Sequence, residues 1–216
     1  MTPRADWSDL ALTAETLAVA RGGVAVLEGV TLSVKAGQAL VLRGANGLGK
    51  TTLLRCLAGI QAPLTGSLSV PAENVTYAAH ADGLKSVLTV QENLAFWASV
   101  HGQGGAGAAM AAMNLTHLQA RRAAELSAGQ KRRLGLARLL VTGRWMWLLD
   151  EPTVSLDAAS VALFAGVLRT HLARGGGAIM ATHIDLGLPE AQVMDLTSYR
   201  ATGNQPVQGG FDEAFS

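Results

Sequence analysis

The chain has 216 residues and a formal net charge of +1; charged residues make up 15% of it and hydrophobic residues 49%. This hydrophobic content excludes a disordered chain, and the length suits one α/β domain. The near-neutral charge argues against a nucleic-acid-binding protein, which usually carries a clear basic excess.

The first predicted elements are strands. Short apolar runs alternate with glycine turns over residues 10–42, a texture typical of strands and hairpins. The sequence GANGLGKT follows, from Gly44 to Thr51, and matches the pattern G-x-x-x-x-G-K-[ST] in full. It lies between an apolar strand and a helical run that ends at Gly59, which is the context in which this pattern binds phosphate.

The residue types of this loop suit a nucleotide. Lys50 is expected to place its charge at the β- and γ-phosphates of ATP, and the Thr51 hydroxyl is expected to bind Mg²⁺. Backbone N–H groups at a helix N-terminus attract anionic oxygens. The predicted phosphate-binding residues are Gly44, Ala45, Asn46, Gly47, Leu48, Gly49, Lys50, Thr51 and Thr52.

The chain has one cysteine, Cys56, so no internal disulfide is possible. It stands in the apolar run LLRCLAGI and is expected to be a buried, inert thiol. The opening residues MTPRADWSDLAL lack the basic and apolar regions of a signal peptide. No apolar run reaches the roughly 18 residues that a membrane helix needs.

The middle of the chain is predicted to change from strands to helices. GSLSV and NVTYAA read as strands, and a helix then begins after Thr89, which forms a capping-box pattern with Glu92. GQGGAG has the spacing of a dinucleotide fingerprint but no preceding strand, so a turn is predicted. An alanine-rich helix is predicted over residues 108–126. We therefore expect a single domain over residues 8–204 with a helical subdomain at about 89–126, and a tail over 205–216.

Alternating helices and strands return after residue 126. The segments 131–143 and 158–174 read as helices, and WMWLLD and GAIMATH as buried strands. Asp150 ends the first of these strands and is expected to hold Mg²⁺ through its water shell. Glu151 follows it and is expected to polarise an attacking water.

The sequence LSAGQ, from Leu126 to Gln130, predicts a second anion site. Ser127 and Gln130 form another capping-box pattern ahead of a helix, and this helix N-terminus with Gly129 can hold a phosphate. A second γ-phosphate site has a use if two copies pair head to tail and each offers this helix to the nucleotide of the other.

These motifs, in this order, resemble those of the ABC-transporter ATPases. The set also includes Ser155-Leu156-Asp157 and Thr182-His183, and the resemblance covers roughly residues 10–200. It implies an α/β fold, a P-loop NTPase cassette with a mixed sheet core, an antiparallel β subdomain and a helical subdomain. It further implies ATP and Mg²⁺ as cofactors, Glu151 as general base, His183 at the γ-phosphate and Asp157 at the dimer seam.

Two positions depart from the family pattern. His80 stands where relatives carry a glutamine that touches the metal or the attacking water, and it is either a catalytic part or a neutral substitution. Arg21 stands where an aromatic side chain often stacks on adenine, and its guanidinium could stack there instead. The stretch H-x-x-G-L-K from His80 and the short chain resemble one branch, the haem-exporter ATPases of cytochrome c maturation.

The resemblance implies integral membrane subunits as partners, a second ATPase copy, and an indirect, peripheral association with the cytoplasmic face of the bacterial inner membrane. The segment LTVQENLAFWASV is expected to form the docking surface, with Phe96 and Trp97 either as anchors or as core residues. The cargo is expected not to touch this chain. The alternatives are an exporter ATPase for a drug or lipid, a nucleic-acid or ribosome ATPase, and a small-molecule P-loop kinase.

Overall fold

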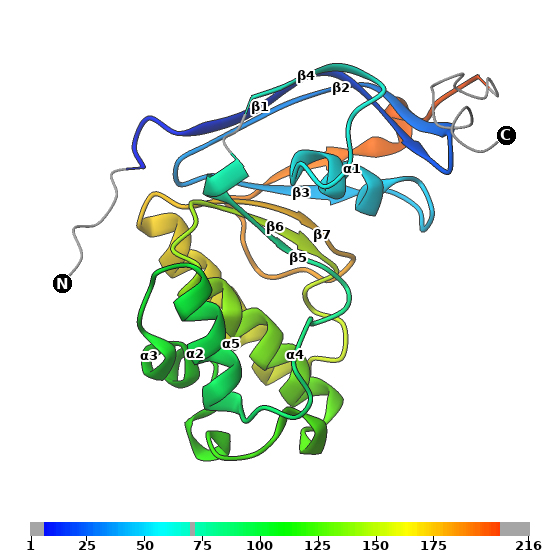
Figure 1. Ribbon diagram of the computed structural model, residues 1–216. Coiled ribbons are helices and arrows are strands. Elements are labelled where there is room, and N and C mark those ends of the chain that lie inside the picture. Colours follow the sequence, from blue (N-terminus) through cyan, green and yellow to red (C-terminus); the bar gives the residue numbers. More distant parts are fainter. Residues whose placement is uncertain (1–6, 70–71, 204–216) are drawn as a thin grey trace, which may run out of the picture.

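The computed structural model describes residues 7–69 and 72–203, and within them two β-sheets form the framework of the molecule (Figure 1). The first sheet is antiparallel and has the strand order β2-β1-β4. Its strands are β1 (Ala11–Arg21), β2 (Val24–Lys35) and β4 (Thr65–Ser69). The predicted strand texture of this part of the chain is confirmed.

The second sheet is parallel in every pairing and has the order β5-β6-β7-β3-β8. Its strands are β3 (Ala39–Arg43), β5 (Val75–Ala78), β6 (Met146–Asp150), β7 (Gly177–Ala181) and β8 (Gln192–Asp195). All residues of β6 and β7 are buried, which explains their uninterrupted apolar sequences. The α/β fold is confirmed, and the expected mixed core is one parallel and one antiparallel sheet.

Helix α1 (Lys50–Leu57) lies between the two sheets (Figure 1). Its apolar side chains pack with the inner faces of both sheets in one core cluster. Cys56 belongs to this cluster and is fully buried, and burial raises the pKa of its thiol. A buried thiol with a raised pKa is a poor nucleophile, as the sequence predicted.

The remaining helices cover the other face of the parallel sheet (Figure 1). They are α2 (Val90–Val100), α3 (Ala106–Ala112), α4 (Ala128–Ala137) and α5 (Ala158–Ala173), and they share a second core cluster. Short 3-10 segments cover Ala72–Asn74, Thr116–Leu118, Ala123–Glu125, Arg138–Val141 and Leu196–Tyr199. Over the residues that the structure describes, every helix is too short or too polar to cross a membrane.

Both predicted capping boxes are present. The Thr89 hydroxyl accepts from Glu92 N at 3.2 Å, and the Glu92 carboxylate accepts from Thr89 N at 2.8 Å. At α4, the Ser127 hydroxyl accepts from Gln130 N at 3.3 Å, and Gln130 Oε1 accepts from Ser127 N at 3.0 Å. Each box satisfies backbone donors that a helix start leaves without partners.

The predicted helix over residues 108–126 is correct only as far as Ala112 and wrong beyond it. Helix α3 stops at Ala112, and Asn114 adopts a left-handed conformation with φ of 49°. The segment that follows is used as a partner for α2, because Val90 N donates to Arg121 O at 2.9 Å and Gln91 N donates to Gln119 O at 3.1 Å. Tertiary hydrogen bonds to the start of α2 therefore outweigh the local helix propensity of the alanine-rich sequence.

Strand β8 was not predicted. It has only four residues at the edge of the parallel sheet, three of them exposed, so its sequence shows no apolar run. Residues 102–105 of GQGGAG form the expected turn between α2 and α3, and its last two residues begin α3; a helix and not a strand precedes it.

Candidate functional site

The phosphate loop has a backbone that only glycine adopts easily. Gly44 and Gly49 have φ angles of 141° and 118°. A Cβ atom on Gly44 would lie 2.4 Å from Leu48 Cδ2, and one on Gly49 would lie 3.1 Å from the side chains of Leu27 and Val26. Glycine at these positions lets the loop turn tightly into the first turn of α1, where backbone N–H groups lack helical acceptors.

Lys50 is the buried cation of this loop, with 7% of its surface exposed. Its Nζ donates to Gly44 O at 2.7 Å and to Ala45 O at 3.1 Å. The ammonium group is therefore held by the loop itself, next to the free N–H groups of the helix start. This arrangement of donors suits a polyphosphate.

Asp150 is buried at the end of β6 and has two hydroxyl partners. Thr51 Oγ1 donates to its Oδ1 at 3.1 Å, and the Tyr77 hydroxyl donates to its Oδ2 at 3.2 Å. Hydroxyl and carboxylate oxygens are the donor set that Mg²⁺ prefers, so Thr51 and Asp150 fit this ion. Tyr77 was not singled out from the sequence, because one tyrosine in a strand has an ordinary core role.

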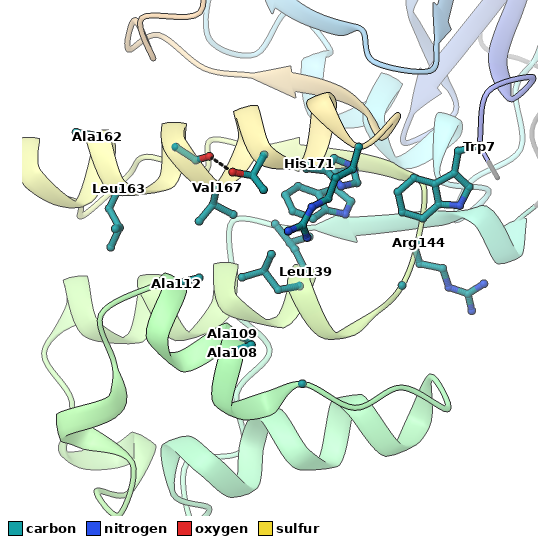
Figure 2. Close-up of a pocket in the computed structure, with 17 residues that line it drawn as sticks. Trp7, Ala108, Ala109, Ala112, Leu139, Arg144, Ala162, Leu163, Val167 and His171 are labelled. Carbon is teal, nitrogen blue, oxygen red and sulfur yellow. Dashed lines mark hydrogen bonds between the residues drawn. The ribbon is translucent and has the colours of Figure 1, made fainter. Parts of the chain in front are cut away.

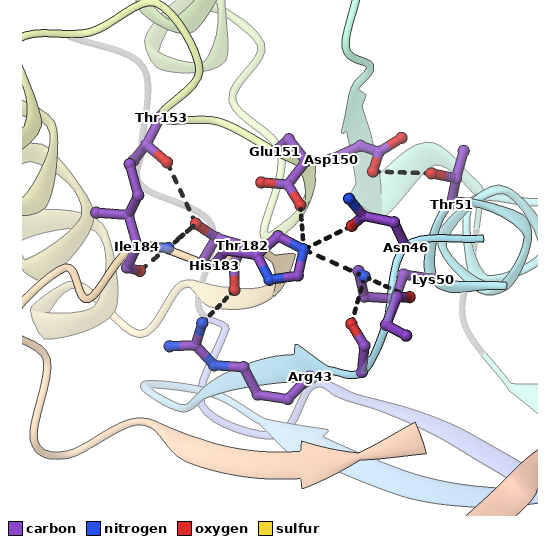
Figure 3. Close-up of polar contacts among 12 residues, drawn as sticks. Arg43, Asn46, Lys50, Thr51, Asp150, Glu151, Thr153, Thr182, His183 and Ile184 are labelled. Carbon is purple, nitrogen blue, oxygen red and sulfur yellow. Dashed lines mark hydrogen bonds and ion pairs between the residues drawn. The ribbon is translucent and has the colours of Figure 1, made fainter. Parts of the chain in front are cut away.

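His183 follows β7 and meets the loop from the other side of the site (Figure 3). Its Nε2 lies 2.9 Å from Asn46 Oδ1, 3.4 Å from Glu151 Oε1 and 3.5 Å from Lys50 Nζ. Because the two nearer neighbours are acceptors, the proton belongs on Nε2. Tertiary structure thus brings together residues that lie more than 130 positions apart in the sequence.

Glu151 has an unusual backbone for a side chain with a Cβ, with φ of 47°. Its N–H donates to Ala181 O at 2.8 Å, and its carbonyl accepts from Arg132 Nη2 at 2.7 Å. Arg132 also donates to Pro152 O at 3.0 Å and is almost fully buried, with 4% of its surface exposed. These bonds hold the turn that presents the Glu151 carboxylate to His183.

Arg132 was missed by sequence reasoning, because a basic run at the start of a helix usually faces solvent. Its Nη1 also donates to Ala79 O at 3.1 Å and to His80 O at 3.3 Å, and it pairs with Asp82 at 2.8 Å. One guanidinium therefore ties α4 to the turn after β6 and to the segment after β5. The His80 imidazole itself is exposed, and within the described residues it makes no hydrogen bond.

A cleft of about 220 Å³ collects most of these groups. Arg21, at the end of β1, contributes to its wall. The cleft is lined by Arg21, Asn46, Gly47, Gly49, Lys50, Thr51, Thr52, Asp150 and Glu151. The residues Ser127, Gly129 and Gln130 do not line it, so the two predicted anion sites are separate within one chain.

The start of α4 instead contacts the loop after β6. A Cβ on Gly129 would lie 3.0 Å from Ser155 O, so glycine permits this close approach. Ser155 itself has φ of 65°. Asp157 accepts from Ser160 N at 2.8 Å and caps α5, and the hydrogen bonds from Ser160 lower the pKa of its carboxyl group.

A larger cavity, of about 630 Å³, lies between α3, the Arg138–Val141 segment and α5 (Figure 2). Its wall is mostly apolar and includes Trp7, Trp147 and His171, with the last two rings stacked at 3.7 Å. It contains no residue of the phosphate loop. Its size does not mark it as the reaction site, because the convergent charged groups line the smaller cleft.

The two aromatic side chains of α2 have different environments. Phe96 is 38% exposed, and Lys85 Nζ lies 4.6 Å from its ring centre. Trp97 packs against the helical core, and the Arg138 guanidinium lies 4.1 Å from its ring centre. Phe96 therefore remains available as an anchor for a partner, while Trp97 belongs largely to the core.

Comparisons with known proteins agree with this geometry. The family model for the ABC transporter matches residues 27–154. The cytochrome c biogenesis ATP-binding export protein CcmA of Rhodobacter capsulatus is 64% identical over 204 residues, which cover 94% of each chain. The protein of that name from Paracoccus denitrificans is 59% identical over 206 residues, 94% of this chain and 98% of that one. The structure of an ATP-binding ABC transporter protein from Pyrococcus furiosus superposes with a TM-score of 0.79 at 24% identity, covering 89% of this chain and all of that chain.

Proposed function

The chain belongs to the ABC transporter family as an ATP-binding subunit of the CcmA type, and on that premise we propose that it hydrolyses ATP to drive haem handling in cytochrome c maturation. The observation that carries the ATPase part is that Lys50 and Glu151 line one cleft, and that His183 Nε2 lies within 3.5 Å of both side chains. The part of the proposal that concerns haem is supported by the names of the relatives.

The phosphate loop holds ATP in this proposal. Loop N–H groups bind the phosphate oxygens, and Lys50 exchanges its two loop carbonyls for the β- and γ-phosphates. Thr51 and Asp150 would hold Mg²⁺, which neutralises charge that develops on the phosphates. The Arg21 guanidinium stacks on the adenine.

Hydrolysis depends on the groups at the far side of the cleft. Glu151 accepts a proton from the attacking water, and the strained turn that Arg132 holds keeps its carboxylate in place. His183 donates through Nε2, which now serves Asn46 and Glu151, to the γ-phosphate. We propose that His80 responds to the membrane partner, since its ring is exposed and its backbone carbonyl accepts a hydrogen bond from Arg132.

A second copy completes each site. Ser127, Gly129 and Gln130 lie at the exposed start of α4, outside the cleft of their own chain. In a head-to-tail dimer, this helix N-terminus faces the γ-phosphate held by the other copy. Asp157 and Ser155 then lie at the dimer seam, next to the start of α4.

Integral membrane subunits are the other partners. The surface around α2 supplies the contact, with exposed Phe96 and Val100 on one helix face. Binding of the ATPase to those subunits places it at the cytoplasmic side of the bacterial inner membrane. ATP hydrolysis then drives the export of haem or its release on a carrier protein.

The test is replacement of this chain in its bacterium by a Glu151→Gln variant. The variant loses its general base, so purified protein should show ATP hydrolysis at least 100-fold below wild type, within the range expected of a proton-transfer group. Cells that carry it should lack haem-bearing c-type cytochromes, while the variant still co-purifies with membrane subunits and retains ATP.

Two results would contradict the proposal separately. Near-normal hydrolysis by Glu151→Gln would remove Glu151 from its assigned role. Normal cytochrome c assembly in cells without the chain, combined with a defect in drug or lipid export, would assign the ATPase to another substrate.

A further inference from the structure

Asp150 is held by two hydroxyl groups, and only one of them belongs to the phosphate loop. Thr51 donates to Oδ1 at 3.1 Å from helix α1, and Tyr77 donates to Oδ2 at 3.2 Å from strand β5. Each carboxylate oxygen therefore has its own donor. Asp150 as a whole residue is only 4% exposed, so few water molecules compete with these two donors.

The sheet register explains why Tyr77 reaches this carboxylate. In the parallel pairing of β5 with β6, Tyr77 lies opposite Leu148, two residues before Asp150. Residues two apart in a strand point to the same face, so Tyr77 and Asp150 share the face that α1 covers. The Tyr77 ring packs in the core cluster around α1, and only its hydroxyl extends to the site.

A tyrosine hydroxyl keeps its proton at neutral pH, because its ordinary pKa is about 10. The hydroxyl has a single proton, and the structure directs it to Asp150 Oδ2.

We propose that Tyr77 is a positioning residue of the magnesium site: its hydroxyl fixes the rotation of the Asp150 carboxylate so that Oδ1 faces Thr51. The inference rests on the proposed function, because the metal site is part of it. The terminal torsion of an aspartate is soft, so two hydrogen bonds are needed to hold one orientation. Mg²⁺ demands near-ideal octahedral geometry and is sensitive to this orientation.

The test is the Tyr77→Phe variant of the full-length chain, which removes one oxygen atom and keeps the ring in the core. ATP affinity is measured with excess Mg²⁺ and with EDTA, and ATPase activity is measured across Mg²⁺ concentrations. We expect ATP binding with Mg²⁺ to be roughly tenfold weaker, because one hydrogen bond to a charged group is lost. ATP binding in EDTA should be unchanged. The Mg²⁺ concentration for half-maximal hydrolysis should rise by a similar factor.

Tyr199→Phe is the matched control, since Tyr199 is the other of the two tyrosines and packs against the same core cluster. Its hydroxyl makes no hydrogen bond in the part of the chain that the structure describes, so both affinities should stay at wild-type values. Equal losses in Mg²⁺ and EDTA for Tyr77→Phe would make Tyr77 a support of the loop alone, and no loss in either would leave it without a role. Failure of wild-type protein to bind or hydrolyse ATP would instead overturn the proposed function.

Discussion

His183 Nε2 has three polar neighbours within 3.5 Å, from the phosphate loop and from the end of β6. Asn46 Oδ1 and Glu151 Oε1 accept the Nε2 proton, whereas the Lys50 ammonium at 3.5 Å is a donor and finds its acceptors in the loop carbonyls. A phosphate oxygen would accept the same proton. In the proposed complex, His183 therefore keeps its proton on Nε2 and exchanges one acceptor for another.

A second histidine, His171, lies in the core and not beside the cleft. His171 is buried against Trp147, and its Nε2 lies 2.9 Å from Trp145 O. Burial lowers its pKa from 6.5 to about 4, although the backbone hydrogen bonds partly oppose the shift. His171 is therefore neutral in the folded protein at any pH above about 5.

This burial predicts acid sensitivity. Between pH 6.5 and pH 4 the unfolded chain binds a proton at His171 that the folded chain does not, so protonation favours unfolding. The free energy of unfolding should be insensitive to this group above pH 6.5 and should fall by up to about 3 kcal/mol towards pH 4. Urea unfolding at a series of pH values measures the slope.

The matched variants are His171→Phe, which keeps a ring on Trp147, and His117→Gln at an exposed histidine. His171→Phe should flatten the slope between pH 6.5 and pH 4, even if its stability is lower overall. His117→Gln should leave the slope as in wild type. An unchanged slope in His171→Phe would show that other groups cause the acid sensitivity.

At the scale of elements, α2 and α4 begin in the same way but face different partners. Both have a hydroxyl cap with a reciprocal side chain at the third helical position. The start of α2 is additionally closed by backbone carbonyls of residues 119–121, whereas the start of α4 is exposed. Of these two helices, α4 is therefore the one with an N-terminus available to an anion from outside its own chain.

This difference separates the structural from the functional role of a cap. Thr89→Ala and Ser127→Ala should each lower the free energy of unfolding by about 1 kcal/mol, because each removes one capping hydrogen bond. Only Ser127→Ala should also lower ATP hydrolysis, by roughly tenfold for a lost bond to a charged group. Equal ATPase activity in the two variants would limit Ser127 to its capping role.

At the scale of the whole molecule, the separation of the two predicted anion sites supports the proposed head-to-tail assembly. The cleft around Lys50 and the start of α4 do not meet in one chain. In the proposed head-to-tail pair, each cleft meets the start of α4 of the other copy. The assembly is therefore a condition of catalysis in our proposal.

Mixing two inactive variants tests this arrangement. Lys50→Ala disables the phosphate loop and Ser127→Arg disables the start of α4. In a mixed pair, one site contains both disabled parts and the other contains neither. If the variants pair at random, about half of the pairs are mixed and each has one active site in two, so the mixture should recover up to about a quarter of wild-type hydrolysis.

Each variant alone is the control and should remain inactive at every protein concentration. Wild-type activity per chain should also rise with protein concentration until the dimer is saturated. Absence of recovery in the mixture, with both variants folded, would place the complete site within one chain.

Local sequence was sufficient to predict the elements and motifs that depend on interactions between nearby residues. The glycines of residues 44–49, the two capping boxes and the buried strand ending at Asp150 are each specified by neighbours within a few positions. The buried strands β6 and β7 could be predicted because strands buried on both faces have uninterrupted apolar sequences.

Long-range contacts were decided only by the tertiary structure. The alanine-rich segment after Ala112 is not a continuous helix and supplies hydrogen-bond acceptors to the start of α2. Strand β8 forms only because β3 offers it a sheet edge. Tyr77, Arg132 and His183 meet the ends of β6 and the phosphate loop through strand register and buried hydrogen bonds. A short stretch of sequence does not identify these partners, because the contacts between them form only after distant segments have packed together.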